Sequence, residues 1–178
     1  IVDTTRTTDA VSITGRVEFR PGTEAFSLFP WDSSLSVTVA ASGDSLTWTY
    51  EVANDDARPL PYGFALHPFF ARQGRTFVKA SARYAMEADA GLPSGRLLPV
   101  AGTYLDLREP VDADTLGLDT VYFDRSPIES GILFPDAGFS IALRTSSEFT
   151  HLVVYTPSGQ PFVCVENQTC STDAHNLH

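Results

Sequence analysis

Two ionisable side chains stand out in the sequence because apolar residues surround them. His67 lies among the glycine, proline and aromatic residues of segment 60–70. Glu166 follows an apolar run and is the one charged residue between Pro161 and Thr172. Burial disfavours the ionised form of a carboxyl group, so its pKa rises and it becomes a usable base. A histidine and such a glutamate are suited to reversible proton transfer near neutral pH, which indicates general acid/base chemistry.

The local sequence also indicates how these side chains are positioned. Pro68 favours an extended backbone at His67, as at a strand end or turn. Phe162, Cys164 and Glu166 share one side of a strand by parity, so Glu166 faces a cleft if the other two face inward. The alternative places Glu166 in solvent at the top of an edge strand and His67 in ordinary packing. The pattern alone leaves both interpretations open.

Alternating apolar and polar residues predict strands through most of the chain. Ser42-Gly43-Asp44 separates two such runs and predicts a hairpin. The only short helical candidate is 112–116. We therefore predict an all-β antiparallel sandwich or barrel, with residues 1–178 as a single domain. The predicted strands are 11–19, 35–39, 46–52, 76–86, 104–107, 121–123, 139–143, 152–155 and 162–165.

The composition describes an acidic, folded protein. The chain has 178 residues, 43% of them hydrophobic, which excludes a disordered or collagen-like segment. The net charge of −10 argues against nucleic acid and anionic membrane surfaces as partners. No apolar run reaches the roughly 20 residues that span a bilayer, and no signal peptide is recognisable. We expect a cytoplasmic location.

Metal and covalent chemistry have little support in the sequence. The histidines lack HxH or HExxH spacing, and Cys164 and Cys170 are six apart rather than in a CxxC motif. A disulfide between them is one interpretation, but we favour a small buried side chain at Cys164 and a loop residue at Cys170. Residues 167–169 form a formal glycosylation sequon, which requires a secretory context. We predict no metal and no cofactor.

Five segments resemble, in order, motifs of the aldose 1-epimerase (galactose mutarotase) family. Segment 60–70 resembles the GFxxHPxF signature. Segment 149–157 resembles a strand that leads to a YTP turn, and segment 162–169 resembles the CVEPxT strand. Segment 92–100 is a weaker match to an LPTGELLPV stretch, and segment 118–122 is a weaker match to an xDxxF segment. The ordered set is specific, and it favours the functional interpretation of His67 and Glu166. The segments are 60–70, 92–100, 118–122, 149–157 and 162–169.

This resemblance implies a galactose mutarotase-like supersandwich with a sugar cleft, and interconversion of the α- and β-anomers of an aldohexose. By position, Glu166 would be the general base that takes the proton of the C1 hydroxyl. His67 would be the general acid that protonates the ring oxygen, and Asp119 would hydrogen-bond sugar hydroxyls. We expect His67 and Glu166 in one concave cleft, a sugar ring's width apart.

The sequence also departs from the family pattern. Asn167 stands where the family usually has proline. Family members are longer, so we expect that this chain lacks an N-terminal portion and the last strands, and that its open sheet edges promote self-association.

Two alternative functions remain on the sequence alone. One is a sugar-phosphate mutarotase, with Arg72, Arg75 and Arg96 at the cleft mouth, although we favour a solvated surface role for these arginines. The other is a non-catalytic carbohydrate-binding module, against which the retention of both His67 and Glu166 speaks. An unrelated β-sandwich interaction domain is disfavoured by the motif order.

Overall fold

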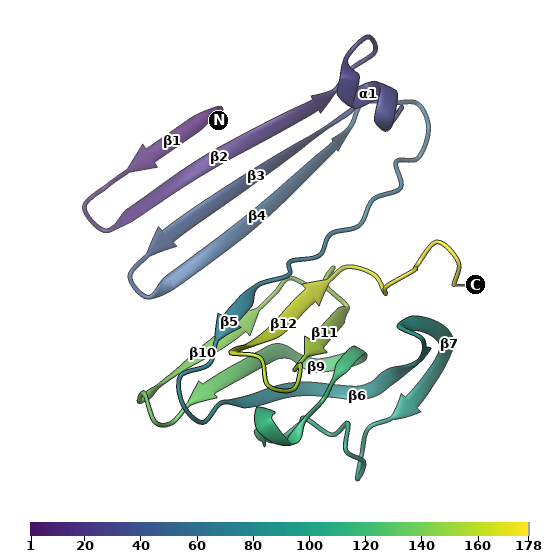
Figure 1. The fold of residues 1–178 in the computed structure, drawn as a ribbon. Coiled ribbons are helices and arrows are strands. Elements are labelled where there is room, and N and C mark those ends of the chain that lie inside the picture. The colour runs from purple at the N-terminus through teal and green to yellow at the C-terminus, as the bar shows by residue number, and fades with distance from the viewer. Residues whose placement is uncertain (178) are drawn as a thin grey trace. The chain divides into compact units, whose positions relative to one another are not determined.

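Antiparallel strands form most of the computed structural model, which describes residues 1–177, except for the side chain of Pro127. This confirms the predicted all-β antiparallel class. The chain divides into two compact units, residues 1–62 and the residues from Gly63 onward, each with its own sheet (Figure 1). The single domain over 1–178 stays a prediction, and His178 lies outside the described residues. Within those residues, no helix has the length and apolar character needed to cross a membrane.

The first unit is a four-stranded antiparallel sheet in the order β1-β2-β3-β4. The predicted hairpin is confirmed, because Ser42 pairs with Ser45 across a turn in which Gly43 has a φ of 58°. The sequence did not predict α1 (Glu24–Leu28), since five residues are too few to show a helical stripe. The strands are β1 (Asp3–Arg6), β2 (Ala10–Phe19), β3 (Ser33–Ser42) and β4 (Ser45–Asn54).

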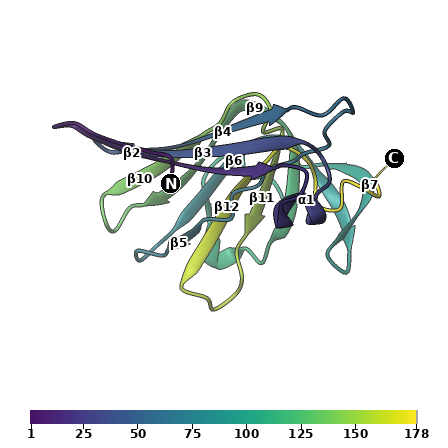
Figure 2. The ribbon, with the colours of Figure 1, turned by 90° about the horizontal axis from the view of Figure 1, so that it is seen from above.

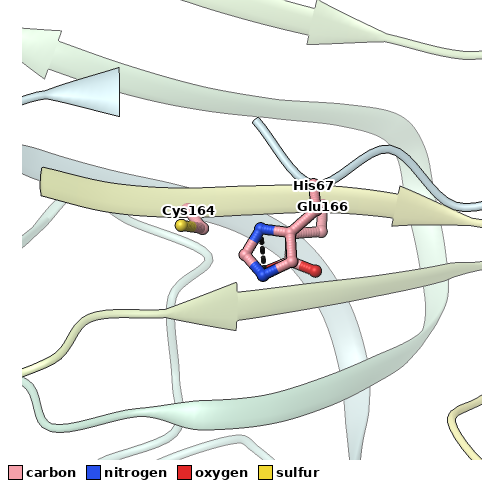
Figure 3. Close-up of side chains that lie close together, drawn as sticks. All are labelled: His67, Cys164 and Glu166. Atoms are coloured by element: carbon pink, nitrogen blue, oxygen red, sulfur yellow. Dashed lines mark ion pairs between the residues drawn. The ribbon is translucent and has the colours of Figure 1, made fainter. Parts of the chain in front are cut away.

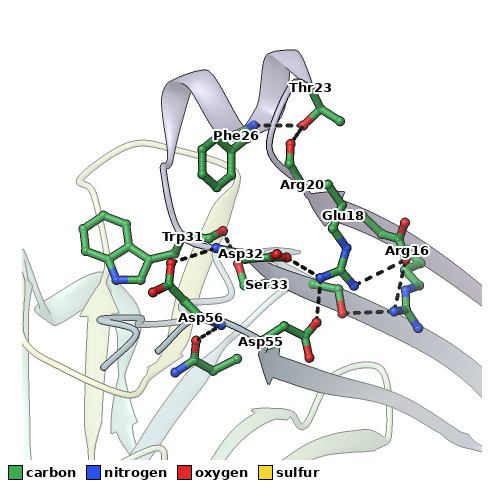
Figure 4. A network of polar contacts seen from close by, with 12 residues as sticks. Arg16, Glu18, Arg20, Thr23, Phe26, Trp31, Asp32, Ser33, Asp55 and Asp56 are labelled. Atoms are coloured by element: carbon green, nitrogen blue, oxygen red, sulfur yellow. Dashed lines mark hydrogen bonds and ion pairs between the residues drawn. The ribbon is translucent and has the colours of Figure 1, made fainter. Parts of the chain in front are cut away.

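Polar contacts hold the connections at one end of this sheet (Figure 4). Thr23 caps α1, because its Oγ1 accepts a hydrogen bond of 3.2 Å from the backbone N–H of Phe26. Arg20 follows β2 and forms ion pairs with Asp32, before β3, and with Asp55, after β4. One guanidinium group therefore joins three segments of the first unit.

The second unit is a larger sheet in the order β5-β12-β11-β9-β6-β7, in which β10 also pairs with β9 and β8 with β6. Figure 2 shows β12 between β5 and β11. A 3₁₀ turn at Ala113–Thr115 confirms the short helical candidate. The strands are β5 (Phe69–Ala71), β6 (Phe77–Asp89), β7 (Leu92–Pro99), β8 (Val111–Asp112), β9 (Asp119–Phe134), β10 (Phe139–Arg144), β11 (His151–Tyr155) and β12 (Phe162–Gln168).

The predicted strand at 104–107 is wrong. This segment is irregular, and its alternating Leu105 and Leu107 are buried because the segment packs onto the sheet as a loop. The carbonyl of Leu107 accepts a 2.7 Å hydrogen bond from the N–H of Ala80 in β6. Burial from a loop produced the same period-two pattern that a strand produces.

The hydrophobic core lies on one face of this sheet. The core includes Val163 and Val165 of β12 and Leu152 and Val154 of β11. Side chains alternate along a strand, so the residues between these positions face the opposite side. The core therefore determines which side chains of β11 and β12 are left to form a site, among them Glu166.

Ile132 is a sensitive test of this core, because it is fully buried in β9 between Val78 of β6 and Ile141 of β10. We expect Ile132→Ala to lower the free energy of unfolding by about 2–5 kcal/mol, measured by urea denaturation. Leu92→Ala is the control, because Leu92 is 57% exposed, and it should change stability far less. Equal losses for the two variants would contradict the position of the core.

The described strands that pair on one side only are β1 and β4 in the first unit and β5, β7, β8 and β10 in the second. Strand edges present unpaired backbone groups that attract other strands. The expected self-association through such edges stays a prediction.

Candidate active site

Strand pairing places His67 opposite Glu166. The residue two positions before His67 forms a bridge with Gln168, and the residue two positions after it pairs with Cys164. Glu166 lies midway between Gln168 and Cys164 on β12. An antiparallel register that holds on both sides of a residue fixes its partner in between, and opposite residues share a face. His67 is therefore brought to Glu166 by the backbone rather than by a chance side-chain orientation.

The two side chains are in direct contact (Figure 3). Nδ1 of His67 lies 3.2 Å from Oε1 of Glu166, and their side chains are 53% and 7% exposed, respectively. The imidazole also stacks on the ring of Phe69, with 4.7 Å between centroids and 4° between planes. The expected separation of a sugar ring's width is thus wrong for this structure, because the register sets the pair side by side.

A cavity of about 390 Å³ brings together all three site residues that the sequence predicted, His67, Asp119 and Glu166. Its size lies within the range of about 300–1,000 Å³ that is common for small-molecule sites. Asp119 is the first residue of β9 and pairs with Tyr155 of β11. The cavity therefore combines an exposed carboxylate with the buried carboxyl of Glu166.

Other residues of the cavity wall were missed by sequence reasoning, namely Met86, Tyr155 and Gln168. Gln168 was accessible to prediction, since it shares the parity of Glu166 on β12. Met86 was not, because it reaches the cavity from β6, which is distant in sequence from β12.

The electrostatic environment favours a basic carboxylate. The pKa of Glu166 is raised, chiefly because burial penalises its charged form. His67 opposes this rise, whereas the negative charge of Asp119 adds to it. A carboxylate with a raised pKa binds a proton more readily than an exposed one, so Glu166 is suited to act as a base.

The cysteines are both free thiols. Cys164 is fully buried, and burial, followed by the charge of Glu166, raises the pKa of its thiol to about 11. Cys170 is partly buried beyond the end of β12. This agrees with the favoured sequence interpretation rather than with a disulfide.

Asn167 occupies the position at which the family pattern has proline. Its residue is 6% exposed, and by parity it lies on the core side of β12. Its backbone carbonyl accepts a 3.1 Å hydrogen bond from the N–H of Leu66. The sequon at this position is therefore inaccessible to a glycan in the folded chain.

The three arginines considered for phosphate binding lie elsewhere. Arg72 forms an ion pair with Asp114, Arg75 with Asp136 and Arg96 with Glu87. None of the three lines the cavity, and no lysine or arginine occurs among the described residues that do.

The family model for aldose 1-epimerase matches residues 2–178 of the sequence. The chain belongs to the aldose 1-epimerase family. This membership confirms the resemblance found in the motifs. No curated protein gives a significant match by sequence.

Solved structures share the galactose mutarotase-like fold at low identity. A galactose mutarotase-like protein from Clostridium acetobutylicum is 17% identical with a TM-score of 0.81, and covers 98% of this chain and 57% of its own. A galactose 1-epimerase from Lactobacillus acidophilus is 15% identical with a TM-score of 0.75. The match covers 98% of this chain and 59% of that protein. A galactose mutarotase-like protein from Lactobacillus casei is 21% identical with a TM-score of 0.70. The match covers 93% of this chain and 60% of that protein. The chain thus spans less than two thirds of the length of each.

Proposed function

We propose that this site interconverts the α- and β-anomers of an unphosphorylated aldose, in particular an aldohexose. The observation that carries the proposal is the contact between Nδ1 of His67 and Oε1 of Glu166 on the wall of a cavity that Asp119 also lines. A buried base beside a half-exposed histidine supplies a proton acceptor and a proton donor in one place.

The close contact suits the chemistry of a hemiacetal. The C1 hydroxyl and the ring oxygen are bonded to the same carbon, so a base for one and an acid for the other must lie near each other. Glu166 takes the hydroxyl proton while His67 protonates the ring oxygen, and the bond from C1 to that oxygen breaks. Rotation about C1–C2 in the open aldehyde exposes its other face. Ring closure then returns both protons in the reverse direction.

The charges of the cavity favour a neutral sugar over a sugar phosphate. Glu166 and Asp119 supply carboxyl groups, and the described lining residues include no lysine or arginine to bind a phosphate. Like charges at short range raise the free energy of binding. The exposed carboxylate of Asp119 is an acceptor for sugar hydroxyls, which is the role that the family resemblance implies for it.

A non-catalytic carbohydrate-binding module is the alternative function. Binding alone needs hydrogen-bond partners but no matched acid and base. Polarimetry of freshly dissolved α-glucose and α-galactose separates the two. An epimerase shortens the approach to the equilibrium rotation in proportion to protein concentration, whereas a binding module leaves the buffer rate unchanged.

Asp119→Asn tests the role of Asp119 through two readouts. Loss of a hydrogen bond to the substrate should raise KM by about 10–100-fold, taking a charged hydrogen bond as about 1.5–3 kcal/mol. Loss of its negative charge should lower the pKa of Glu166, because that charge raises it in the wild type. Since the reaction needs ionised Glu166, the acidic limb of the rate profile should move to lower pH.

Asp44→Asn is the matched control, because Asp44 lies in the exposed turn between β3 and β4. It should leave KM and the pH profile unchanged. An acidic limb that stays in place or moves to higher pH in Asp119→Asn would show that Asp119 does not act on Glu166.

A further inference from the structure

Cys164 places a thiol beside the acid/base pair, and the proposed reaction gives it no role. One ligand atom from each of His67, Cys164 and Glu166 lies within 4.8 Å of the other two. Figure 3 shows Cys164 and Glu166 on the same strand, with the imidazole of His67 beside Glu166. The histidine is the exposed member of this triad and the other two are buried.

The three donors match the ligand preferences of zinc. Imidazole nitrogen, thiolate sulfur and carboxylate oxygen are the ligands that proteins use for Zn²⁺, and sites with three protein ligands leave a fourth position open. Bond lengths of about 2.0–2.3 Å put the ligand atoms of a tetrahedral site about 3.3–3.8 Å apart. Atoms of His67 and Glu166 already lie 3.2 Å apart. The three ligand atoms lie within 4.8 Å of one another, so binding requires them to approach by about 1 Å at most.

The backbone presets this arrangement. His67 precedes β5 and lies opposite Glu166, between the bridge at Ala65 and the pairing of β5 with β12. Cys164 is the next residue on the same face of β12. Two of the three ligands are thus fixed on one strand, and the half-exposed imidazole lies on the side from which an ion would enter. Preorganised ligands of this kind lower the cost of closing a metal site.

We propose that His67, Cys164 and Glu166 bind one divalent ion of the zinc type, with its fourth position open to the cavity. On binding, the thiol of Cys164 loses its proton to solvent and its sulfur lone pair forms the bond to the ion. A proton shared between His67 and Glu166 leaves in the same way. If the proposed function is correct, the bound ion occupies the lone pairs that acid/base catalysis needs, so zinc inhibits anomer exchange.

Cobalt(II) is the probe for the site itself, because a thiolate bound to this ion gives a charge-transfer absorption in the near ultraviolet. The wild-type protein, reduced and stripped with a chelator, should show this band and saturate at one equivalent. Cys164→Ser should abolish the band, whereas Cys170→Ser should keep it. Cys170 is the matched control because it is the other free thiol.

Competition with zinc measures the contribution of the remaining ligands. His67→Asn and Glu166→Gln should each weaken zinc binding by at least about tenfold, by comparison with the 10–100-fold effects of outer-shell partners. His175→Asn should leave the affinity unchanged. Circular dichroism verifies that each variant is folded, and Cys164→Ala replaces Cys164→Ser if the latter is not.

Several results would overturn the proposal. These are the lack of a thiolate band in the wild type, a band that persists in Cys164→Ser, or one that disappears in Cys170→Ser. The spectra need no sugar turnover, so a failure of the proposed function leaves this test intact. Where turnover occurs, zinc should inhibit Cys164→Ser at least about tenfold less strongly than the wild type, each compared with its own zinc-free rate.

Discussion

We expect the replacement of Glu166 with glutamine to lower the rate of anomer exchange by about 10²–10⁴-fold. The amide has nearly the same size as the carboxyl group and retains hydrogen-bonding atoms, but it cannot accept the proton of the C1 hydroxyl. Glu166 is 7% exposed on its side chain, so water has little access to take over as the base. Polarimetry of fresh α-galactose at neutral pH measures the loss.

Glu129→Gln is the matched control for this change. Glu129 pairs with Arg144 on the surface, with 2.6 Å between Oε2 and Nε, and it does not line the cavity. We expect wild-type rates for it. A Glu166→Gln variant that is folded and retains more than about a tenth of the wild-type rate would exclude Glu166 as the general base, since general-base catalysis contributes at least about 10²-fold.

Replacing His67 with asparagine has a similarly large expected effect on the rate, about 10²–10⁴-fold. Asparagine is polar but does not donate and recover a proton near neutral pH. The variant also removes the neighbour that favours ionised Glu166, so the pKa of Glu166 should rise further. The acidic limb of the residual rate should accordingly move to higher pH. A pH series followed by polarimetry measures both effects.

His175→Asn serves as the control, because His175 is exposed and does not line the cavity. It should leave the rate and the pH profile unchanged. A His67→Asn variant with normal turnover would show that another group, or water, protonates the ring oxygen. A limb that moves to lower pH would contradict the electrostatic coupling of His67 to Glu166.

Local alternation in the sequence was enough to place Glu166 on the same face of a strand as Cys164, but not to decide whether that face lines a cleft. The apolar run before it predicted a strand, and β12 extends over Phe162–Gln168. Parity then placed Glu166 on the same face as Cys164, away from Val163 and Val165 in the core. This prediction depends only on the alternation of side chains along one strand, so it does not require the pairing of the strands to be known.

The contact between His67 and Glu166 was beyond local reasoning. It depends on β5 pairing with β12, two strands far apart in the chain, and on the register of that pairing. A shift by one residue would turn one of these side chains to the other face. Family resemblance brought the two residues into one cleft but assigned them a separation that the register does not give.

The length of β9 was also hidden from the sequence. The alternation predicted a strand over 121–123, whereas β9 covers Asp119–Phe134. The backbone of Asp124 has a φ of 58°, and the pairing with β6 shifts register between Ala80 and Ala82. An irregularity of this kind breaks the period of two, so the two halves of the strand do not appear as one pattern.

The most direct test of the account is NMR exchange spectroscopy of equilibrated glucose and galactose labelled at C1, with the wild-type protein present. Cross-peaks between the α- and β-anomer signals should appear above the buffer background and grow with protein concentration, and Glu166→Gln should remove them. Sugar signals that shift or broaden with the wild-type protein, yet show no exchange above buffer, would contradict catalysis at this site and indicate a binding module.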